Sequence, residues 1–332
     1  MSEVRVVNDL WQPTSSCDVN CLNDDEPFTA VGRLRSASRF AAAAGVMLVA
    51  VVLTPVLPLL PAGSRARPVR WCARGVLRAL GIRVSVRGRI PSWRPAAGRG
   101  AAGSACGGTL VVANHISWLD IVVLLAAGRT RLVAKCEVGE WPVVGRIARY
   151  AGTIFVDRAR PRALPAAVAD VRSALEAGEV VVVFPEGTTS CGRSIGRFRP
   201  AFFQAAVEAG AAIVPVTLRF GLAGAGRTAA AAFIGDETLL DSLRRIMRLP
   251  RLDIRLVCGS IIHPASGATR RSLARVAAMA VGASGPAADR GTRRQAPVAV
   301  PPVAVPPVAP IPLRTEVADE GAAGPLALRR AA

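Results

Sequence analysis

Short apolar runs alternate with longer amphipathic stretches through the middle of the chain. The short runs predict strands, which we expect over 81–88, 109–113, 132–134, 153–156, 180–184, 213–219 and 254–257. The amphipathic stretches predict helices over 117–127, 165–177 and 200–209. Because strands that alternate with helices are typical of α/β folds, the sequence predicts a mainly parallel sheet flanked by helices.

A much longer apolar stretch precedes these strands. Residues 40–62 form a run of 23 residues without a charge, enough to cross a hydrocarbon layer of about 30 Å as a helix. Pro55, Pro58 and Pro61 would disrupt its second half. Since arginines flank both ends, the positive-inside rule gives no orientation. A spanning helix and a helical hairpin that dips into one leaflet both remain open, with the hairpin slightly ahead of the span. The length of the run argues against a buried core helix.

The chain therefore divides into four predicted segments. Residues 70–83 carry apolar side chains at helical spacing with arginines between them, which indicates either an interfacial helix or a solvated helix packed on the main domain. After about residue 285 the chain becomes rich in proline and alanine, as in disordered tails. The predicted segments are an acidic, disordered N-terminus (1–32), a membrane-associated helical segment (33–80), the main α/β domain (81–284) and a disordered tail (285–332).

The formal net charge of +19 is unevenly spread. Residues 1–32 are acidic, so the body of the protein is strongly basic and favours a polyanion, either a nucleic acid or an anionic lipid surface. Aromatic residues make up only 5% of the chain, and no recognition-helix or zinc-finger pattern is present. Together with the apolar stretch, this predicts an anionic membrane surface as a partner and no nucleic acid; the oligomeric state stays open.

Seven cysteines are scattered along the chain. Cys17 and Cys21 have no histidine or second cysteine pair near them in sequence, so we expect no metal site and no disulfide framework. This pattern is typical of reduced cysteines in a protein whose working side faces the cytoplasm.

A histidine and a carboxylate stand five residues apart where the strand 109–113 ends. His115 is one of only two histidines, and a neutral imidazole can accept a proton while a carboxylate fixes its tautomer. Five residues correspond to about 140° around a helix, so His115 and Asp120 cannot share a helical face. We expect His115 in the strand-to-helix turn, with Ser117 as N-cap and Asp120 reaching back from the first helical turn. A purely structural histidine remains an alternative at this point.

Three further patterns lie at strand ends or within a strand. Arg158 follows the run 152–156, and the sequence Phe-Pro-Glu-Gly-Thr-Thr-Ser begins at Phe184, where another apolar run ends. Pro215 breaks the apolar strand 213–216. Because ligands of open α/β sheets bind at the carboxyl ends of strands, these groups could converge on one pocket.

In this order, the four patterns resemble the four motifs of the glycerolipid acyltransferase family that includes the 1-acyl-glycerol-3-phosphate acyltransferases. These motifs are the NHxxxxD box, the GxxFxxR box, the FPEGTxS box and a proline-bearing apolar strand, and the match covers about 81–264. Lys135, the only lysine of the chain, resembles the lysine of a K-x-E segment between the first two boxes.

The resemblance implies an enzyme of lipid metabolism and phospholipid biosynthesis. His115 would be the general base on a free hydroxyl of a lysolipid acceptor, which attacks an acyl thioester directly, and Asp120 would orient His115. The acceptor would be bound by Lys135, Arg158, Glu186, Gly187 and Thr188. Backbone N–H groups around Gly187 are expected to face the anion or the tetrahedral oxyanion. The donor would be an acyl-CoA or an acyl carrier protein thioester, with no other cofactor.

One position departs from the family pattern. Many relatives have arginine after FPEGT, whereas this chain has Thr189, so one cation near the expected phosphate is missing. Lysophosphatidate remains the first acceptor, with lyso-ornithine lipid or a lysophospholipid as alternatives; three arginines downstream could restore the charge: Arg193, Arg197 and Arg199. A catalytically silent lipid-binding relative is a further alternative, but such a protein would be expected to lose His115 or Asp120.

Overall fold

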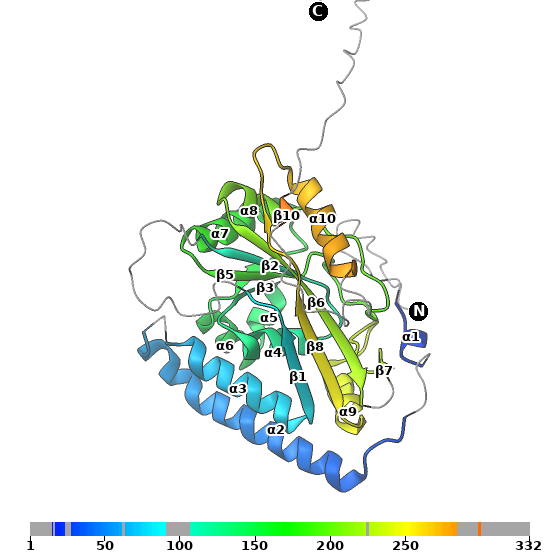
Figure 1. Cartoon of the computed structure of the whole chain (residues 1–332). Coiled ribbons are helices and arrows are strands. Elements are labelled where there is room, and N and C mark those ends of the chain that lie inside the picture. The colour runs from blue at the N-terminus through cyan, green and yellow to red at the C-terminus, as the bar shows by residue number, and fades with distance from the viewer. Residues whose placement is uncertain are drawn as a thin grey trace, which may run out of the picture. The chain divides into compact units, whose positions relative to one another are not determined.

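A mixed, mostly parallel sheet forms the centre of the computed structural model, which describes residues 15, 17–23, 28–61, 64–90, 107–223, 226–283 and 298–299. The main strand order is β1-β8-β6-β2-β5-β3-β4 (Figure 1). These strands are β1 (Ile82–Arg87), β2 (Thr109–Ala113), β3 (Arg131–Lys135), β4 (Ile154–Val156), β5 (Val180–Val183), β6 (Ala212–Leu222) and β8 (Leu252–Cys258). Three two-residue strands extend the sheet: β7 (Gly226–Arg227), β9 (Ile262–His263) and β10 (Val298–Ala299).

The pairing confirms the predicted mainly parallel sheet. Strand β2 lies between β5 and β6 and is parallel to both, and β3 is parallel to β4 and β5. The second half of β6 pairs with β8 in the antiparallel sense. The carboxyl ends of β2, β3, β4 and β5 therefore meet along one edge of the sheet.

Strand β6 continues through Pro215, in contrast to the predicted break. On one side it keeps its parallel register with β2 through this position. On the other side its partner changes, because β8 ends opposite Val216 and β9 begins opposite Ile213. Proline has no N–H to donate, so it fits where the neighbouring ladder is interrupted. Its carbonyl still accepts a hydrogen bond from the Gly259 N–H at 2.8 Å.

Helices cover both faces of the sheet and bury alternate strand residues. Val111 and Val182 pack in one apolar cluster with α3, α4 and α9, while Leu110 and Val181 pack in another with α7, α8 and α10. The helices are α3 (Ala66–Ala79), α4 (Trp118–Ala127), α7 (Leu164–Glu176), α8 (Phe203–Glu208), α9 (Leu239–Arg248) and α10 (Arg270–Ala283). Two short helices follow β3, namely α5 (Cys136–Glu140) and α6 (Val144–Tyr150). Strands β2 and β5 are thus buried on both sides, as their continuous apolar runs predict, whereas β1 is exposed along most of its length.

The N-terminal apolar stretch forms a helical hairpin. Helix α2 (Arg33–Leu53) ends where a 3-10 turn, Thr54–Leu59, accommodates Pro55 and Pro58. Helix α3 then returns and packs against α2 and α4 (Figure 1). It occupies 66–79 rather than the expected 70–83, because Gly81 turns the chain into β1. In the described part of the chain, α2 is the one helix long and apolar enough to cross a membrane by length and composition.

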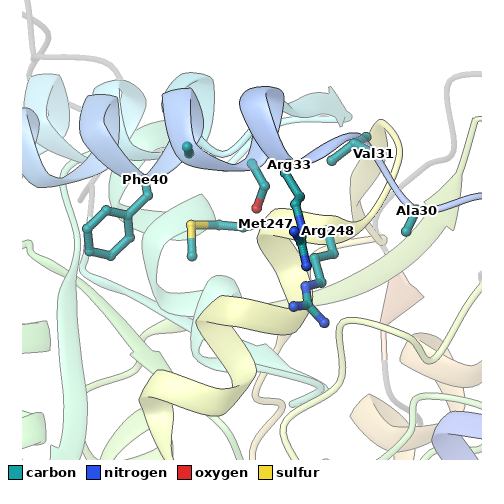
Figure 2. Close-up of a pocket in the computed structure, with 8 residues that line it drawn as sticks. Ala30, Val31, Arg33, Phe40, Met247 and Arg248 are labelled. Atoms are coloured by element: carbon teal, nitrogen blue, oxygen red, sulfur yellow. The ribbon is translucent and has the colours of Figure 1, made fainter.

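A buried arginine fixes this hairpin to the body. The Arg39 guanidinium donates hydrogen bonds to the carbonyl oxygens of Met247 (3.1 Å) and Leu249 (2.7 Å) at the end of α9. A hollow of about 420 Å³ lies beside this contact, between the start of α2 and α9; Figure 2 shows residues that line it. It is lined among others by Ala30, Val31, Arg33, Phe40, Met247 and Arg248. None of the predicted site residues lines it, so the hollow is separate from the chemistry described below.

The two ends of the chain differ from the predicted disorder at a few residues. Residues 17–23, including α1 (Asn20–Asn23), lie against the body, where Cys17, Cys21 and Leu22 contact the core. In the tail, Val298–Ala299 pair with β9. Residues 15 and 28–32 are also described, whereas the other residues of the predicted disordered segments, and residues 91–106, lie outside the described part of the chain.

Candidate active site

His115 and Asp120 are in direct contact in the turn between β2 and α4. The His115 Nδ1 atom lies 2.9 Å from Asp120 Oδ2. The same oxygen accepts the backbone N–H groups of Ile116 (2.6 Å) and Ser117 (2.8 Å). Asp120 stands at the third position of α4, as the sequence predicts, and is fully buried. One carboxylate oxygen thus holds both the start of the helix and the imidazole.

This contact selects one form of the imidazole. A carboxylate at Nδ1 favours the tautomer that carries its proton there, which leaves Nε2 with the lone pair that can accept a proton. The ring also stacks on Phe184, with centroids 4.0 Å apart and planes inclined by 16°. The His115 side chain retains 17% of its exposure, so the ring is held firmly while an approach from solvent remains.

Asn114, the first residue of the NHxxxxD box, fixes the beginning of the turn. Its side-chain amide donates to the Leu218 carbonyl (3.1 Å), and its Oδ1 accepts the Leu218 N–H (2.8 Å). The paired bonds continue the contact between β2 and β6 beyond the end of β2. Asn114 was not among the predicted site residues. The sequence signal for it was an amide that can both donate and accept hydrogen bonds, at the first position of the NHxxxxD box.

Glu186 connects the FPEGTTS loop to the same turn. Its Oε1 accepts the His115 N–H at 3.1 Å, and its Oε2 accepts the Gly196 N–H at 3.2 Å. Burial raises the pKa of Glu186, although these two N–H donors act in the opposite direction. The backbone carbonyl of His115 also accepts a hydrogen bond from the Ser190 N–H at 2.9 Å. Glu186 is therefore placed to position the base, and its predicted contact with substrate stays a prediction.

Gly187 closes a turn in the FPEGTTS loop, and its predicted contact with substrate stays a prediction. Its N–H donates to the Phe184 carbonyl at 3.0 Å inside the turn, so this N–H does not face an anion. Its φ of +78° is one that glycine adopts without strain. The Gly187 carbonyl accepts a hydrogen bond from Arg158 Nη1, which joins the second and third boxes. Thr188 follows in the loop, half-buried, and its predicted substrate contact stays a prediction.

Basic side chains gather at the ends of β3 and β4. Lys135 lies opposite Val156 in the register of β3 and β4. Arg158 follows Val156 by two residues. The pKa of Glu137 is lowered by hydrogen bonds from its own backbone N–H and from Cys136. The charges of Lys135 and Arg158 act in the same direction. Glu137 thus lies within electrostatic reach of both cations.

Of the three downstream arginines, Arg199 restores positive charge beside Arg158. Burial and the charge of Arg199 lower the pKa of Arg158, whereas Glu137 raises it. Arg193 instead donates to the Cys21 carbonyl at 3.4 Å. Thr189 donates through its hydroxyl to the Phe233 carbonyl, so this residue is part of the loop's own bonding.

Comparisons with known proteins agree with the motif order. The sequence model of the family described as Acyltransferase matches residues 85–219. A 1-acyl-sn-glycerol-3-phosphate acyltransferase of Neisseria meningitidis is 37% identical over 58% of this chain and 71% of that protein. A lyso-ornithine lipid O-acyltransferase of Pseudomonas aeruginosa is 36% identical over 70% of this chain and 84% of that protein. The chain belongs to the acyltransferase family.

The predicted family is thereby confirmed, and the protein is an acyltransferase enzyme. The fold is also found in a solved structure, the 1-acyl-sn-glycerophosphate acyltransferase of Thermotoga maritima. That chain superposes with a TM-score of 0.58 at 18% identity, covering 79% of this chain and 97% of its own. This likeness concerns the fold, and the roles of individual site residues stay predictions.

The raised pKa of Glu186 gives a pH-dependent stability that Glu186→Gln should remove. The pKa of Glu186 is raised above its ordinary value of 4.5 in the folded protein, so the folded protein binds the carboxyl proton more tightly than the unfolded chain does. The group's stabilising contribution is therefore complete below that value and is lost as pH rises through the folded pKa. The free energy of unfolding is measured in urea for both proteins. The value for the wild type minus the value for Glu186→Gln should fall as pH rises from about 4.5.

The matched control is Glu176→Gln, whose side chain is 52% exposed. The pH dependence of the Glu186→Gln curve is read against this variant over the same pH range. Parallel curves for the wild type and Glu186→Gln would contradict the assignment of a buried, raised-pKa carboxyl at Glu186.

Proposed function

We propose that this acyltransferase moves a fatty acyl group from a thioester to the free hydroxyl of a lysolipid at a membrane surface, with His115 as general base. The observation that carries the proposal is the 2.9 Å contact between His115 Nδ1 and Asp120. His115 Nε2 takes the hydroxyl proton as the acceptor oxygen attacks the thioester carbonyl. The tetrahedral intermediate then expels the thiolate, which receives the proton from the imidazolium, and no covalent acyl-enzyme forms.

The first acceptor we propose is 1-acyl-sn-glycerol-3-phosphate, which would give phosphatidic acid. Its phosphate would contact Arg158, with Lys135 and Arg199 adding positive charge around it. A guanidinium suits this role because it donates two parallel hydrogen bonds to a phosphate. The name of the Neisseria meningitidis relative supports this acceptor.

Lyso-ornithine lipid is a second candidate acceptor, favoured by a specific observation. Thr189 replaces the arginine found at this place in many relatives, and its hydroxyl is bonded to the Phe233 carbonyl. The Pseudomonas aeruginosa relative, of which the chain covers 84%, carries this activity in its name. A catalytically silent relative is no longer an alternative, because the chain is an acyltransferase enzyme and its His115 and Asp120 are both present and in contact.

The membrane contact would be made by the hairpin of α2 and α3. Apolar side chains on α2 are exposed, and only 11% of its apolar 18-residue stretch is buried. The exposed members include Phe40, Met47, Leu48, Val51 and Val52. Arginines around the hairpin would meet anionic lipid headgroups. We place the site on the cytoplasmic side, in keeping with the free thiols of the described cysteines.

Replacement of the proposed base should abolish most of the turnover. His115→Ala should lower kcat by about 10²- to 10⁴-fold, the usual contribution of a general base. His263→Ala is the matched control, because His263 is the other histidine of the chain and is exposed in β9. Acyl transfer is measured with purified protein, acyl-CoA or acyl carrier protein thioester, and lysophosphatidate in mixed micelles. Unchanged turnover in His115→Ala would exclude this base.

Arg158 should affect binding of the acceptor more than turnover. Arg158→Ala should raise the KM for lysophosphatidate about 10-fold or more, because a charge-assisted bidentate contact is lost. Arg162→Ala, an exposed arginine in the loop after β4, should leave the KM unchanged. If Arg158→Ala leaves the KM for lysophosphatidate unchanged, the phosphate contact is wrong. A higher kcat/KM for lyso-ornithine lipid in the wild type would instead assign the second acceptor.

Charges on the exposed face of α2 should weaken membrane binding. The double variant Leu48→Glu/Val52→Glu places two carboxylates where both side chains are more than 60% exposed. We expect at least a 10-fold loss of binding to vesicles that contain anionic lipid, because charged groups are costly in the apolar layer. Leu240→Glu on α9, also at an exposed leucine, is the control and should bind as the wild type does. Equal binding by the double variant would contradict the hairpin as the membrane contact.

A further inference from the structure

Three thiols meet beside the loop that holds His115. Cys17 and Cys21 come from the N-terminal segment, and Cys191 directly follows the FPEGTTS sequence. The three sulfur atoms lie within 4.8 Å of one another, and all three cysteines are free and half-buried. The sequence predicts no metal site, because Cys17 and Cys21 have no histidine or second cysteine pair near them in sequence. The fold brings a third thiol, that of Cys191, from 174 residues away.

The spacing of the first two cysteines suits metal binding. Cys17 and Cys21 form a C-x₃-C pair at the start of α1, within the C-x₂₋₄-C range of thiolate sites. Such a pair alone carries little weight, since two cysteines four residues apart are common in helices. The convergence of Cys191 on the same point is the independent observation.

The surrounding contacts hold the three thiols together. The Cys191 N–H donates to Cys17 Sγ at 3.3 Å, and Arg193 donates to the Cys21 carbonyl at 3.4 Å. The Cys17 N–H in turn donates to Ser15 Oγ at 3.1 Å. These contacts bring the three sulfur atoms to one point between the N-terminal segment and the loop after β5.

We propose that Cys17, Cys21 and Cys191 bind a zinc ion through three thiolates, with water as the fourth ligand. Tetrahedral thiolates at a Zn–S distance of about 2.3 Å lie about 3.8 Å apart, so the sulfur atoms would close by about 1 Å at most. Sulfur ligands select zinc or another soft ion over magnesium and calcium. Binding converts three thiols to thiolates and releases their protons to solvent.

A disulfide is a weaker explanation of the same cluster. It would form between two of the thiols, with loss of two electrons to an oxidant, and would leave the third cysteine without a function. A metal ion uses all three sulfur atoms in one site.

The position of the site gives the ion a structural role in the enzyme. Cys191 follows Ser190, whose N–H donates to the His115 carbonyl. The next residue, Gly192, lies against Ile116, since a Cβ added there would come within 2.6 Å of the Ile116 side chain. The Gly192 carbonyl accepts a hydrogen bond from Arg227 at 2.7 Å. Zinc would therefore join the N-terminal segment to the loop that positions the base.

Metal content of the tag-free, full-length protein, purified without chelator, tests the proposal. We expect about one zinc per chain by mass spectrometry of the metal, and loss of that zinc in Cys17→Ser, Cys21→Ser and Cys191→Ser. Cys72→Ser is the matched control, because Cys72 is a half-buried cysteine of α3 outside the cluster, and should keep the zinc. Metal-free wild type that does not take up added zinc would overturn the proposal, as would full zinc content in Cys191→Ser.

A spectroscopic measurement on the wild type avoids dependence on the folding of the variants. The metal is removed with a chelator and Co²⁺ is added, and a near-ultraviolet thiolate-to-cobalt band is expected to saturate at one equivalent. Absence of this band in refilled wild type would contradict thiolate ligation. Counting thiols in denaturant without reductant adds a separate check: two fewer free thiols than cysteines in the protein as purified would assign a disulfide and overturn the zinc site.

Discussion

The arrangement of the site depends on one carboxylate oxygen. Asp120 Oδ2 accepts the backbone N–H groups of Ile116 and Ser117 and faces His115 Nδ1. The first two bonds begin helix α4, and the third fixes the imidazole, so the helix and the base cannot be positioned independently. Because Asp120 is fully buried, loss of this anion would leave N–H donors unsatisfied as well as the ring unsupported.

A second carboxylate extends this constraint to the rest of the sheet edge. Glu186 accepts the His115 N–H and the Gly196 N–H, so the loop after β5 is bound to the turn after β2. Arg158, after β4, is bound to the same loop through the Gly187 carbonyl. The first three family motifs are therefore joined in one hydrogen-bonded unit at the carboxyl ends of parallel strands. In this unit the FPEGTTS loop supports the base at least as directly as it could contact the substrate.

The sequence predicted the elements and the order of the motifs, because both are local. The strand Thr109–Ala113 is predicted to the residue, and Asp120 stands at the predicted helical position. What it missed depends on contacts between distant segments. The Asn114 amide pairs with Leu218, the charge of Arg199 acts on Arg158, and Cys191 meets the N-terminal cysteines. Spacing along one chain carries no signal for such meetings. Helix α9 was not predicted either, although its residues have helical periodicity.

The central claim is that Asp120 acts through His115, and a double-mutant cycle tests it most directly. The kcat/KM for lysophosphatidate is measured for the wild type, Asp120→Asn, His115→Ala and the double variant, with far-ultraviolet circular dichroism to verify folding. If Asp120 serves catalysis by orienting His115, the double variant should be no less active than His115→Ala alone. Losses that multiply in the double variant would show that the two residues act independently and would contradict this account.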